Sequence, residues 1–325
     1  MKLGSSKFLS ALFAWTVSLA LLPAWAASDF PDRPVMLVVP YTPGGPNDAI
    51  ARAIAPEMSK ELGQPIVIEN KPGAGGNIGT AYVARADADG YTVLLPGISY
   101  VVNPYIFAKV PYAFSDFRPV SVIARGGLVL VVHPSLGVTS LSQLIALAKS
   151  KPGQIGYATG GIGTSLHLAG ELFNRMANVD LLHVPYKGTG ALLPDLLAGR
   201  TPVAFVSPFF VEQFIKRGEL IALGVTSLKP IPAIENIAPI SQLGLPGFEA
   251  YGWFSLLVPA ATPTQIVDKL NAAATSALNS PSVQRKLFAL GMDIVHASPK
   301  EAATYLDAET AKWEKVVKEA HIKVD

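Results

Sequence analysis

The stretch Tyr41-Thr42-Pro43-Gly44-Gly45-Pro46-Asn47-Asp48 directly follows the apolar run Val35–Val39. A strand, a glycine turn and a helix in this order direct backbone N–H groups and a positive helix end at one spot. A second stretch of this kind, Thr159-Gly160-Gly161-Ile162-Gly163-Thr164-Ser165, follows the apolar residues 155–158. Such a spot binds an anion without a cation or a metal. We therefore expect the two turns, although far apart in the chain, to contact one small anion from two sides.

The N-terminal residues have the pattern of a secretion signal. Lys2 and Lys7 are the only charged residues among the first 28, and an apolar stretch covers residues 8–22. Ala24-Trp25-Ala26 fits a cleavage site with small residues, so we predict a signal peptide over residues 1–26. The alternative is a membrane anchor, for which the stretch is short, because a spanning helix needs about 20 apolar residues.

The charge balance argues against a nucleic-acid partner. The chain has 26 Lys and Arg against 24 Asp and Glu, and removal of Lys2 and Lys7 leaves 24 of each. The mature protein would therefore be formally neutral, without the basic surface that phosphate binding needs. The absence of cysteine excludes disulfides, thiol catalysis, thiolate metal sites and a lipid anchor on cysteine.

Short apolar runs alternate with helix-period segments through most of the chain. Ile50, Ile54, Met58 and Leu62 recur at four-residue spacing before Gly63, which is typical of a helix that ends at glycine. Ser140 followed by Gln143 is typical of a capping box. We predict strands at 35–39, 66–68, 93–95, 128–132, 155–158, 181–184, 203–206 and 221–225, and C-terminal helices at 263–278, 282–290 and 299–320. This alternation predicts an α/β architecture with mainly parallel sheets.

Polar residues at the second turn leave two interpretations open. Thr164 and Ser165 can donate to a carboxylate, or they can simply cap the helix that follows. His167 and Glu171 have the spacing of two metal ligands, but no H-E-x-x-H motif is present and we expect no metal. A secreted α/β hydrolase with Ser165 or Ser207 as nucleophile is an alternative function. No G-x-S-x-G elbow supports this alternative. Ser165 and His167 are two residues apart, and such residues on a helix point to different sides.

Many ordered segments together resemble one family, the extracytoplasmic solute receptors of the tripartite tricarboxylate transporter family, also called the Bug family. The resemblance covers essentially the whole mature chain. It rests on Val38-Val39-Pro40, Pro43-Gly44-Gly45 with Asp48, Glu69-Asn70-Lys71-Pro72-Gly73-Ala74-Gly75-Gly76, Asp89-Gly90-Tyr91-Thr92, Gly163-Thr164-Ser165-Leu166-His167-Leu168 with Glu171, Val184-Pro185-Tyr186-Lys187-Gly188, Asp195-Leu196-Leu197-Ala198-Gly199 and Lys312-Trp313.

The resemblance implies a type II periplasmic binding protein fold, an α/β fold of two lobes with a ligand cleft between them. The first domain would hold residues 27–126 plus 247–325, and the second would hold residues 127–246. The implied function is a monomeric periplasmic receptor that captures a small organic carboxylate for membrane permease subunits, without cofactor, metal or catalytic residues. A solute sensor for a membrane kinase would have the same receptor chain and stays open as an alternative.

The resemblance and the two turns together predict the residues that bind the ligand. They are Tyr41, Pro43, Gly44, Gly45, Asp48, Ser99, Thr159, Gly160, Gly163, Thr164, Ser165, His167, Tyr186 and Ser207. One position departs from the family pattern, because Val206 stands where many members carry an acidic residue. A buried acid can pair with a ligand ammonium and a valine cannot. We therefore expect a carboxylate ligand that needs no ammonium group.

Overall fold

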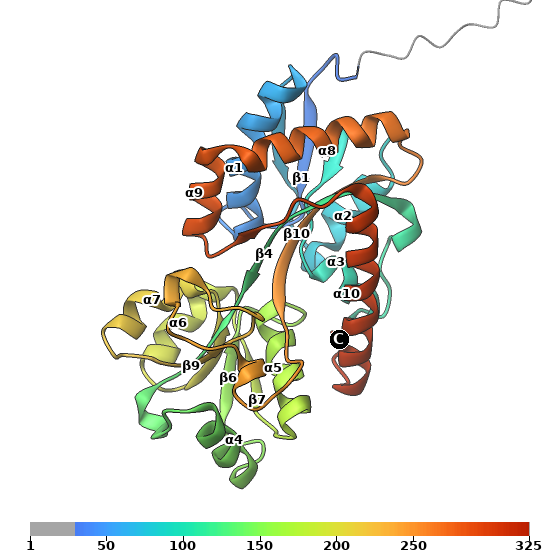
Figure 1. Ribbon diagram of the computed structural model, residues 1–325. Helices are drawn as coiled ribbons and strands as arrows, with labels where there is room; N and C mark the ends of the chain where they lie inside the picture. The colour runs from blue at the N-terminus through green and yellow to red at the C-terminus, as the bar shows by residue number, and fades with distance from the viewer. Residues whose placement is uncertain (1–29, 325) are drawn as a thin grey trace, which may run out of the picture.

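The computed structural model describes residues 30–324, so the predicted signal peptide lies outside the described residues. The chain forms two lobes, each built on its own β-sheet with helices packed against it (Figure 1). The first sheet has six strands in the order β11-β4-β10-β3-β1-β2, and the second has five in the order β7-β6-β8-β5-β9. This two-sheet α/β arrangement confirms the predicted fold class.

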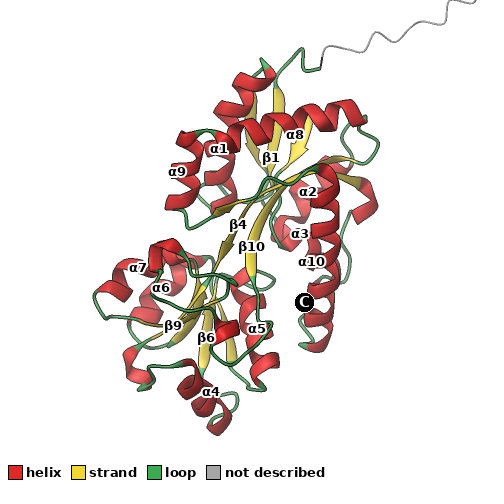
Figure 2. Ribbon diagram, in the orientation of Figure 1, coloured by secondary structure: helices red, strands yellow, loops and turns green. Residues whose placement is uncertain are grey.

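The first lobe combines the N-terminal part of the chain with its C-terminal part. Its strands are β1 (Val35–Val39), β2 (Ile66–Asn70), β3 (Thr92–Leu94), β4 (Phe117–Gly127), β10 (Tyr251–Pro259) and β11 (Asp293–Ile294). Its helices are α1 (Pro46–Leu62), α2 (Asn77–Ala84), α3 (Ser99–Ile106), α8 (Thr264–Asn279), α9 (Pro281–Ala289) and α10 (Pro299–Glu319). In Figure 2, α1 and α8 lie on one side of this sheet and α2, α3 and α10 on the other.

The alternation of side chains along β1 explains this layering. Val35, Leu37 and Val39 pack in one buried cluster with α1 and α8, whereas Val38 belongs to a second cluster on the other face. Successive side chains of a strand point to opposite faces, so a strand covered on both sides is apolar throughout. Gly63 ends α1 in the left-handed conformation, as the sequence predicts.

The second lobe comes from the middle of the chain. Its strands are β5 (Val129–Val132), β6 (Gly156–Thr159), β7 (Leu182–Pro185), β8 (Val203–Val206) and β9 (Ile221–Val225). Its helices are α4 (Leu141–Ser150), α5 (Ser165–Ala177), α6 (Thr189–Leu197) and α7 (Pro208–Lys216). The predicted capping box at α4 forms only in half. Ser140 accepts the N–H of Gln143, but the Gln143 side chain accepts the N–H of Thr139 instead of the N–H of Ser140.

The prediction of mainly parallel sheets is wrong. β1 pairs in parallel with β2 and β3, and β6 with β7 and β8, but β10 is antiparallel to β3 and β4, and β5 to β8 and β9. The long strands β4 and β10 were not predicted. Figure 1 shows both running between the lobes. Because β4 leaves the first lobe and β10 returns to it, adjacent strands on this path must run in opposite directions.

A buried carboxylate attaches α10 to the returning strand. Glu309 of α10 accepts hydrogen bonds at one oxygen from the indole N–H groups of Trp253, at 2.8 Å, and Trp313, at 2.7 Å. Both tryptophans are completely buried. A buried indole N–H needs a partner, so this shared acceptor determines where α10 packs on β10.

Candidate functional site

The first glycine turn is held in place by its own helix. Gly44 has a φ of +83°, which favours glycine, and its N–H donates to Asp48 Oδ2 at 3.0 Å. Arg52 donates to the same oxygen at 2.9 Å, and this bond lowers the pKa of Asp48. No side chain caps α1, because Gly45 occupies its capping position. Asp48 therefore shapes the turn, and its buried carboxylate does not cap the helix.

Tyr41 links this turn to the start of α3. Its hydroxyl is hydrogen-bonded to Ser99 Oγ and receives the N–H of Gly97 at 3.4 Å. Burial raises the pKa of Tyr41. The turn also packs on a glycine cluster, because a Cβ added at Gly76 would lie 3.3 Å from the Tyr41 ring. Two residues predicted from separate parts of the sequence, Tyr41 and Ser99, are thus brought together.

The other end of α3 contacts the second glycine turn. A Cβ added at Gly163 would lie 2.7 Å from Ile106 Cδ1 and 3.9 Å from Asn103 Oδ1. Helix α3 belongs to the first lobe and Gly163 to the second, so the lobes touch here. At 1.5 Å per residue, the Ser99 and Ile106 ends of the helix are about 10 Å apart. Helix α3 therefore contacts both predicted turns, and the separation of these two contacts suits a small ligand.

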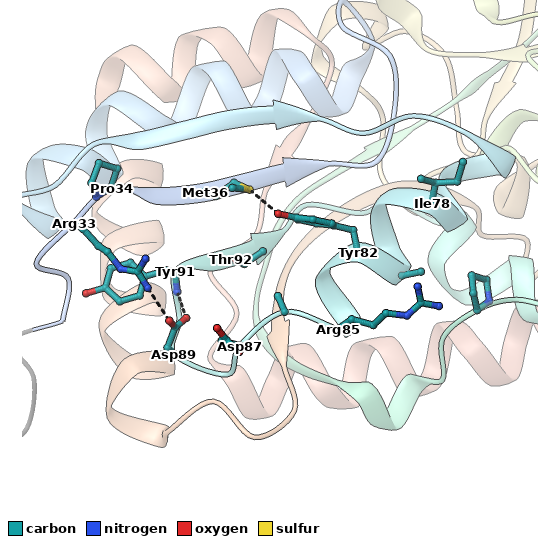
Figure 3. Close-up of a pocket in the computed structure, with 13 residues that line it drawn as sticks. Arg33, Pro34, Met36, Ile78, Tyr82, Arg85, Asp87, Asp89, Tyr91 and Thr92 are labelled. Carbon is teal, nitrogen blue, oxygen red and sulfur yellow. Dashed lines mark hydrogen bonds and ion pairs between the residues drawn. The ribbon is translucent and has the colours of Figure 1, made fainter. Parts of the chain in front are cut away.

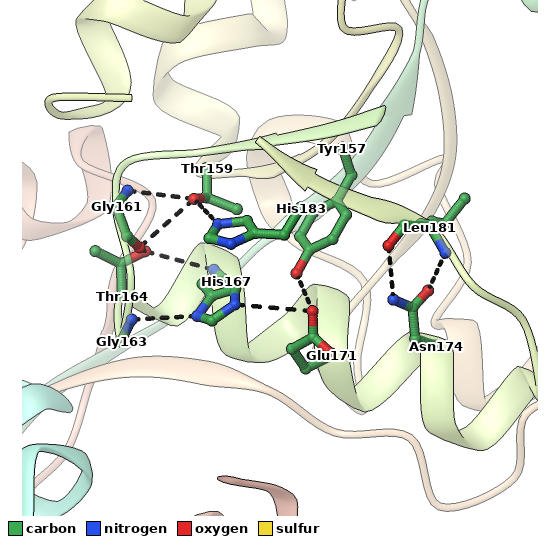
Figure 4. Close-up of polar contacts among 10 residues, drawn as sticks. All are labelled: Tyr157, Thr159, Gly161, Gly163, Thr164, His167, Glu171, Asn174, Leu181 and His183. Carbon is green, nitrogen blue, oxygen red and sulfur yellow. Dashed lines mark hydrogen bonds and ion pairs between the residues drawn. The ribbon is translucent and has the colours of Figure 1, made fainter. Parts of the chain in front are cut away.

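The second turn is tied down by polar groups beneath it, as Figure 4 shows. Thr164 caps α5 by accepting the N–H of His167, and its hydroxyl donates to Gly161 O at 2.7 Å. The N–H of Gly163 donates to His167 Nδ1 at 3.2 Å. The N–H of Gly161 donates to Thr159 Oγ1, also at 3.2 Å. The structure thus gives the Thr164 hydroxyl its capping role.

Both helices that start at these turns keep free N–H groups at their first residues. In residues 30–324, no acceptor receives the N–H of Gly45, Asn47 or Asp48 at α1, or the N–H of Ser165 or Leu166 at α5. Unpaired N–H groups at a helix start carry partial positive charge and attract anions. Two uncharged helix ends that can bind an anion are therefore present.

Strand β10 lies between the two turns. A Cβ added at Gly252 would lie 3.4 Å from Ser165 Oγ, and one added at Gly97 would lie 3.4 Å from Trp253 O. The Ser165 hydroxyl has no hydrogen-bond partner among the described residues and is directed at this strand. Gly252 and Gly97, together with Asn103 of α3, were missed by sequence reasoning. Isolated glycines carry no local signal for close approach to a distant strand.

The remaining predicted residues make other contacts. The Tyr186 hydroxyl donates to Asp195 at 2.8 Å and contacts the Thr201 hydroxyl at 2.8 Å, so it supports α6. Ser207 starts α7, and its hydroxyl lies 3.8 Å from a Cβ built on Gly291 of the first lobe. Pro43 is exposed at the tip of the first turn, and Gly160 is half-buried beside the start of α6.

A cavity of about 730 Å³ on the first lobe contains none of the predicted site residues. Figure 3 shows that it is lined by residues of β1, α2 and β3. Its Arg33 is already paired with Asp89 at 2.9 Å and stacked over Tyr91. Unpaired N–H donors, which an anion site needs, lie at the two turns instead. We therefore place the candidate site at the turns.

Residues 30–324 contain no group of three or more His, Asp or Glu side chains placed to bind one metal ion. None of the helices described is both long enough and apolar enough to cross a membrane.

Comparison with known proteins identifies the family. The family model described as the tripartite tricarboxylate transporter family receptor matches residues 50–322. The chain belongs to this receptor family. Protein BugT of Bordetella pertussis is similar to this receptor, with 35% identity over 302 residues that cover 92% of this chain and 93% of BugT. Members of the family are periplasmic solute-binding proteins, and the predicted resemblance is confirmed.

Two solved structures of relatives contain small carboxylates. The receptor is similar to R. palustris Rpa4515 with adipate, with 38% identity and a TM-score of 0.80, covering 91% of this chain and 99% of that one. It is also similar to MatC (Rpa3494) from Rhodopseudomonas palustris with bound malate. That comparison has 32% identity, a TM-score of 0.76 and coverage of 89% and 100%.

Proposed function

We propose that this receptor captures a small organic carboxylate between its lobes and delivers it to the permease subunits of a tripartite tricarboxylate-type transporter. One observation carries the proposal: the unpaired N–H groups at the starts of α1 and α5 belong to two turns that both contact α3. Fixed N–H groups recognise a carboxylate without a buried cation. The adipate and malate bound by two relatives support this ligand class.

The proposed contacts divide by role. Tyr41, Gly44, Gly45 and Ser99 form one side of the site, with Pro43 at its tip, and Gly160, Gly163 and Ser165 form the other. Asp48, Thr159, Thr164, His167 and Tyr186 support these turns through hydrogen bonds to protein groups. The Ser207 hydroxyl lies 3.8 Å from a Cβ built on Gly291 of the first lobe, and we propose it as a contact from the second lobe.

The ligand should not need an ammonium group. Val206 is completely buried at the end of β8, where it pairs with Val129. Its apolar side chain offers no partner for a cation, and an unpaired buried charge costs several kcal/mol. Dicarboxylates and aromatic acids therefore fit this site better than amino acids.

A thermal-shift screen tests the ligand class. Succinate, glutarate, adipate and L-malate are each compared with the nearest amino acid, aspartate or glutamate, at equal concentration. We expect at least one acid without an ammonium group to raise the melting temperature. Stabilisation by aspartate or glutamate alone would contradict the role given to Val206. Stabilisation by none of a wider acid panel would contradict the proposed function.

Calorimetry of a single hydroxyl deletion tests the site itself. Ser165→Ala removes a hydroxyl that faces β10 without a protein partner. A hydrogen bond to a charged group contributes about 1.5–3 kcal/mol, so affinity for the best acid should fall about tenfold or more. Lys187→Ala is the control, because Lys187 is exposed just after β7. A larger loss in Lys187→Ala than in Ser165→Ala would reverse the assignment.

The remaining parts of the proposal concern assembly and alternatives. We propose a periplasmic monomer whose first domain is 27–126 plus 247–325 and whose second is 127–246. The sheets support this division, because β5–β9 form the second sheet and the other strands form the first. A pull-down that recovers a membrane kinase instead of permease subunits would favour the sensor role.

We also propose that the receptor is not a hydrolase. Neither Ser165 nor Ser207 is hydrogen-bonded to a histidine within residues 30–324. The Nδ1 atom of His167 already accepts the N–H of Gly163. A serine nucleophile needs an adjacent base. Turnover of a generic ester that is abolished by Ser165→Ala would contradict this part.

A further inference from the structure

Two stacked histidines lie directly beneath the second glycine turn (Figure 4). The rings of His167 on α5 and His183 on β7 are parallel within 23°, with centroids 3.8 Å apart. Tyr157 and Thr159 of β6 and Glu171 of α5 complete the cluster. His167 is 3% exposed, so this is a buried polar cluster and must be satisfied internally.

Each histidine controls one glycine of the turn. His167 Nδ1 accepts the N–H of Gly163 at 3.2 Å. His183 Nε2 is 2.7 Å from Thr159 Oγ1, which in turn accepts the N–H of Gly161 at 3.2 Å. The two imidazoles therefore hold the two ends of the segment that precedes α5.

The contact between His167 and Gly163 requires a neutral ring. Because Nδ1 of His167 accepts an N–H, it carries no proton, and the ring proton is on Nε2, 3.7 Å from Glu171 Oε1. A proton on Nδ1 would place two donors against each other at Gly163. Two charged rings in a stack would also repel. Burial accordingly lowers the pKa of His167 to about 3 and that of His183 to about 4.

The other titratable groups near the two histidines would also draw a charged His167 away from Gly163. Tyr157 donates its hydroxyl to Glu171, and burial raises the pKa of both groups. Asp180, in the turn before β7, also raises the pKa of Glu171. A charged His167 would be drawn along α5 toward Glu171 and away from Gly163.

We propose that His167 and His183 are positioning residues for ligand binding: His167 fixes Gly163 by accepting its N–H as a neutral imidazole, and His183 fixes Gly161 through the hydroxyl of Thr159. Protonation of His167 releases Gly163 and weakens binding. This inference rests on the proposed function in one respect, namely that the second turn contacts the ligand anion.

Substitutions at His167 distinguish the loss of a hydrogen-bond acceptor from a change in side-chain volume. His167→Leu fills similar space without an acceptor, and affinity for adipate at pH 7.5 should fall tenfold or more. His167→Asn can present an amide oxygen near the Nδ1 position and should recover most of that loss. His133→Leu is the matched control, because His133 Nδ1 also accepts a backbone N–H at 3.2 Å, from Ser135, in a turn away from the site. Equal losses in His167→Leu and His167→Asn would overturn the positioning role.

A pH profile tests the protonation step. The ratio of adipate association constants for wild type and His167→Asn cancels the titration of the ligand itself. With a pKa of about 3, about half of His167 is neutral at pH 3, so the ratio should fall about twofold from its value at pH 7.5. A ratio that stays constant in receptors shown by circular dichroism to be folded would contradict the proposal.

A measurement without ligand keeps the two proposals distinguishable. Nitrogen-15 NMR of the histidine rings should show His167 as the neutral tautomer with its proton on Nε2. Hydrogen exchange of the Gly163 amide should be tenfold faster in His167→Leu than in wild type. If wild type binds no acid but both signatures are present, only the proposed function fails. A His167 ring with its proton on Nδ1 would overturn the positioning role whatever the ligand.

Discussion

Gly163→Ala should weaken ligand binding more than it weakens the fold. At a φ of +75°, an alanine costs about 1–2 kcal/mol of backbone strain. This strain is present whether or not the lobes touch, so it lowers the free energy of unfolding and leaves affinity alone. The added Cβ also lies 2.7 Å from Ile106 Cδ1 of the other lobe, and this clash arises only when the lobes meet.

The clash sets the expected loss of affinity. Overpacking by one methyl group costs about 1–3 kcal/mol, so the dissociation constant for adipate should rise about tenfold. Ile106→Val removes the Cδ1 atom itself, and the next atom, on Val102, is 3.8 Å away, which is ordinary contact. The double variant Gly163→Ala, Ile106→Val should therefore recover affinity to within about threefold of Ile106→Val alone.

Calorimetry for affinity and urea unfolding for stability check this prediction together. Gly63→Ala is the matched control, because Gly63 has a φ of +72° and nothing lies within 4 Å of its added Cβ. It should lose similar stability and no affinity. Unchanged affinity in Gly163→Ala, or no recovery in the double variant, would refute the claim that the contact between Gly163 and Ile106 is part of the ligand-binding form of the receptor.

Three further predictions concern stability and processing. Glu309→Leu should lower the free energy of unfolding by about 2–6 kcal/mol in urea, because it leaves the indole N–H groups of Trp253 and Trp313 without an acceptor, and an unchanged midpoint would contradict this. Stability should fall as the pH decreases from about 6.5 to about 4, because the unfolded chain binds the proton that folded His183 excludes, and His183→Gln should flatten this part of the profile. The exported protein should begin just after Ala26 by N-terminal sequencing, and an uncleaved chain would disprove the predicted signal peptide.

Sequence reasoning located the strand-to-helix turns because their signals are local. Gly44 and Gly163 adopt the left-handed conformations that their turns require, and Thr164 caps α5 through its own side chain. It could not decide between capping and ligand contact for Thr164. That choice depends on Gly161 O, whose position only the folded turn determines.

The antiparallel part of the sheets could not be predicted in the same way. The apolar pattern of β4 and β10 is interrupted by proline and glycine, and the two strands pair only because the chain leaves one lobe and returns to it. Such pairing requires closure of a loop that contains the whole second lobe. A contact at this sequence separation produces no pattern between residues three or four positions apart.

By itself the sequence determined the two glycine turns that precede α1 and α5, the alternation of strands and helices, the absence of thiol chemistry and the family. These properties depend on residue type and on spacing within a few positions, where backbone geometry and side-chain polarity act directly. Only the tertiary structure decided that α3 and β10 lie between the turns and that His167 and His183 meet beneath Gly163. Contacts between distant segments follow from how the packed lobes satisfy all their buried groups at once, and no short stretch of sequence contains that information.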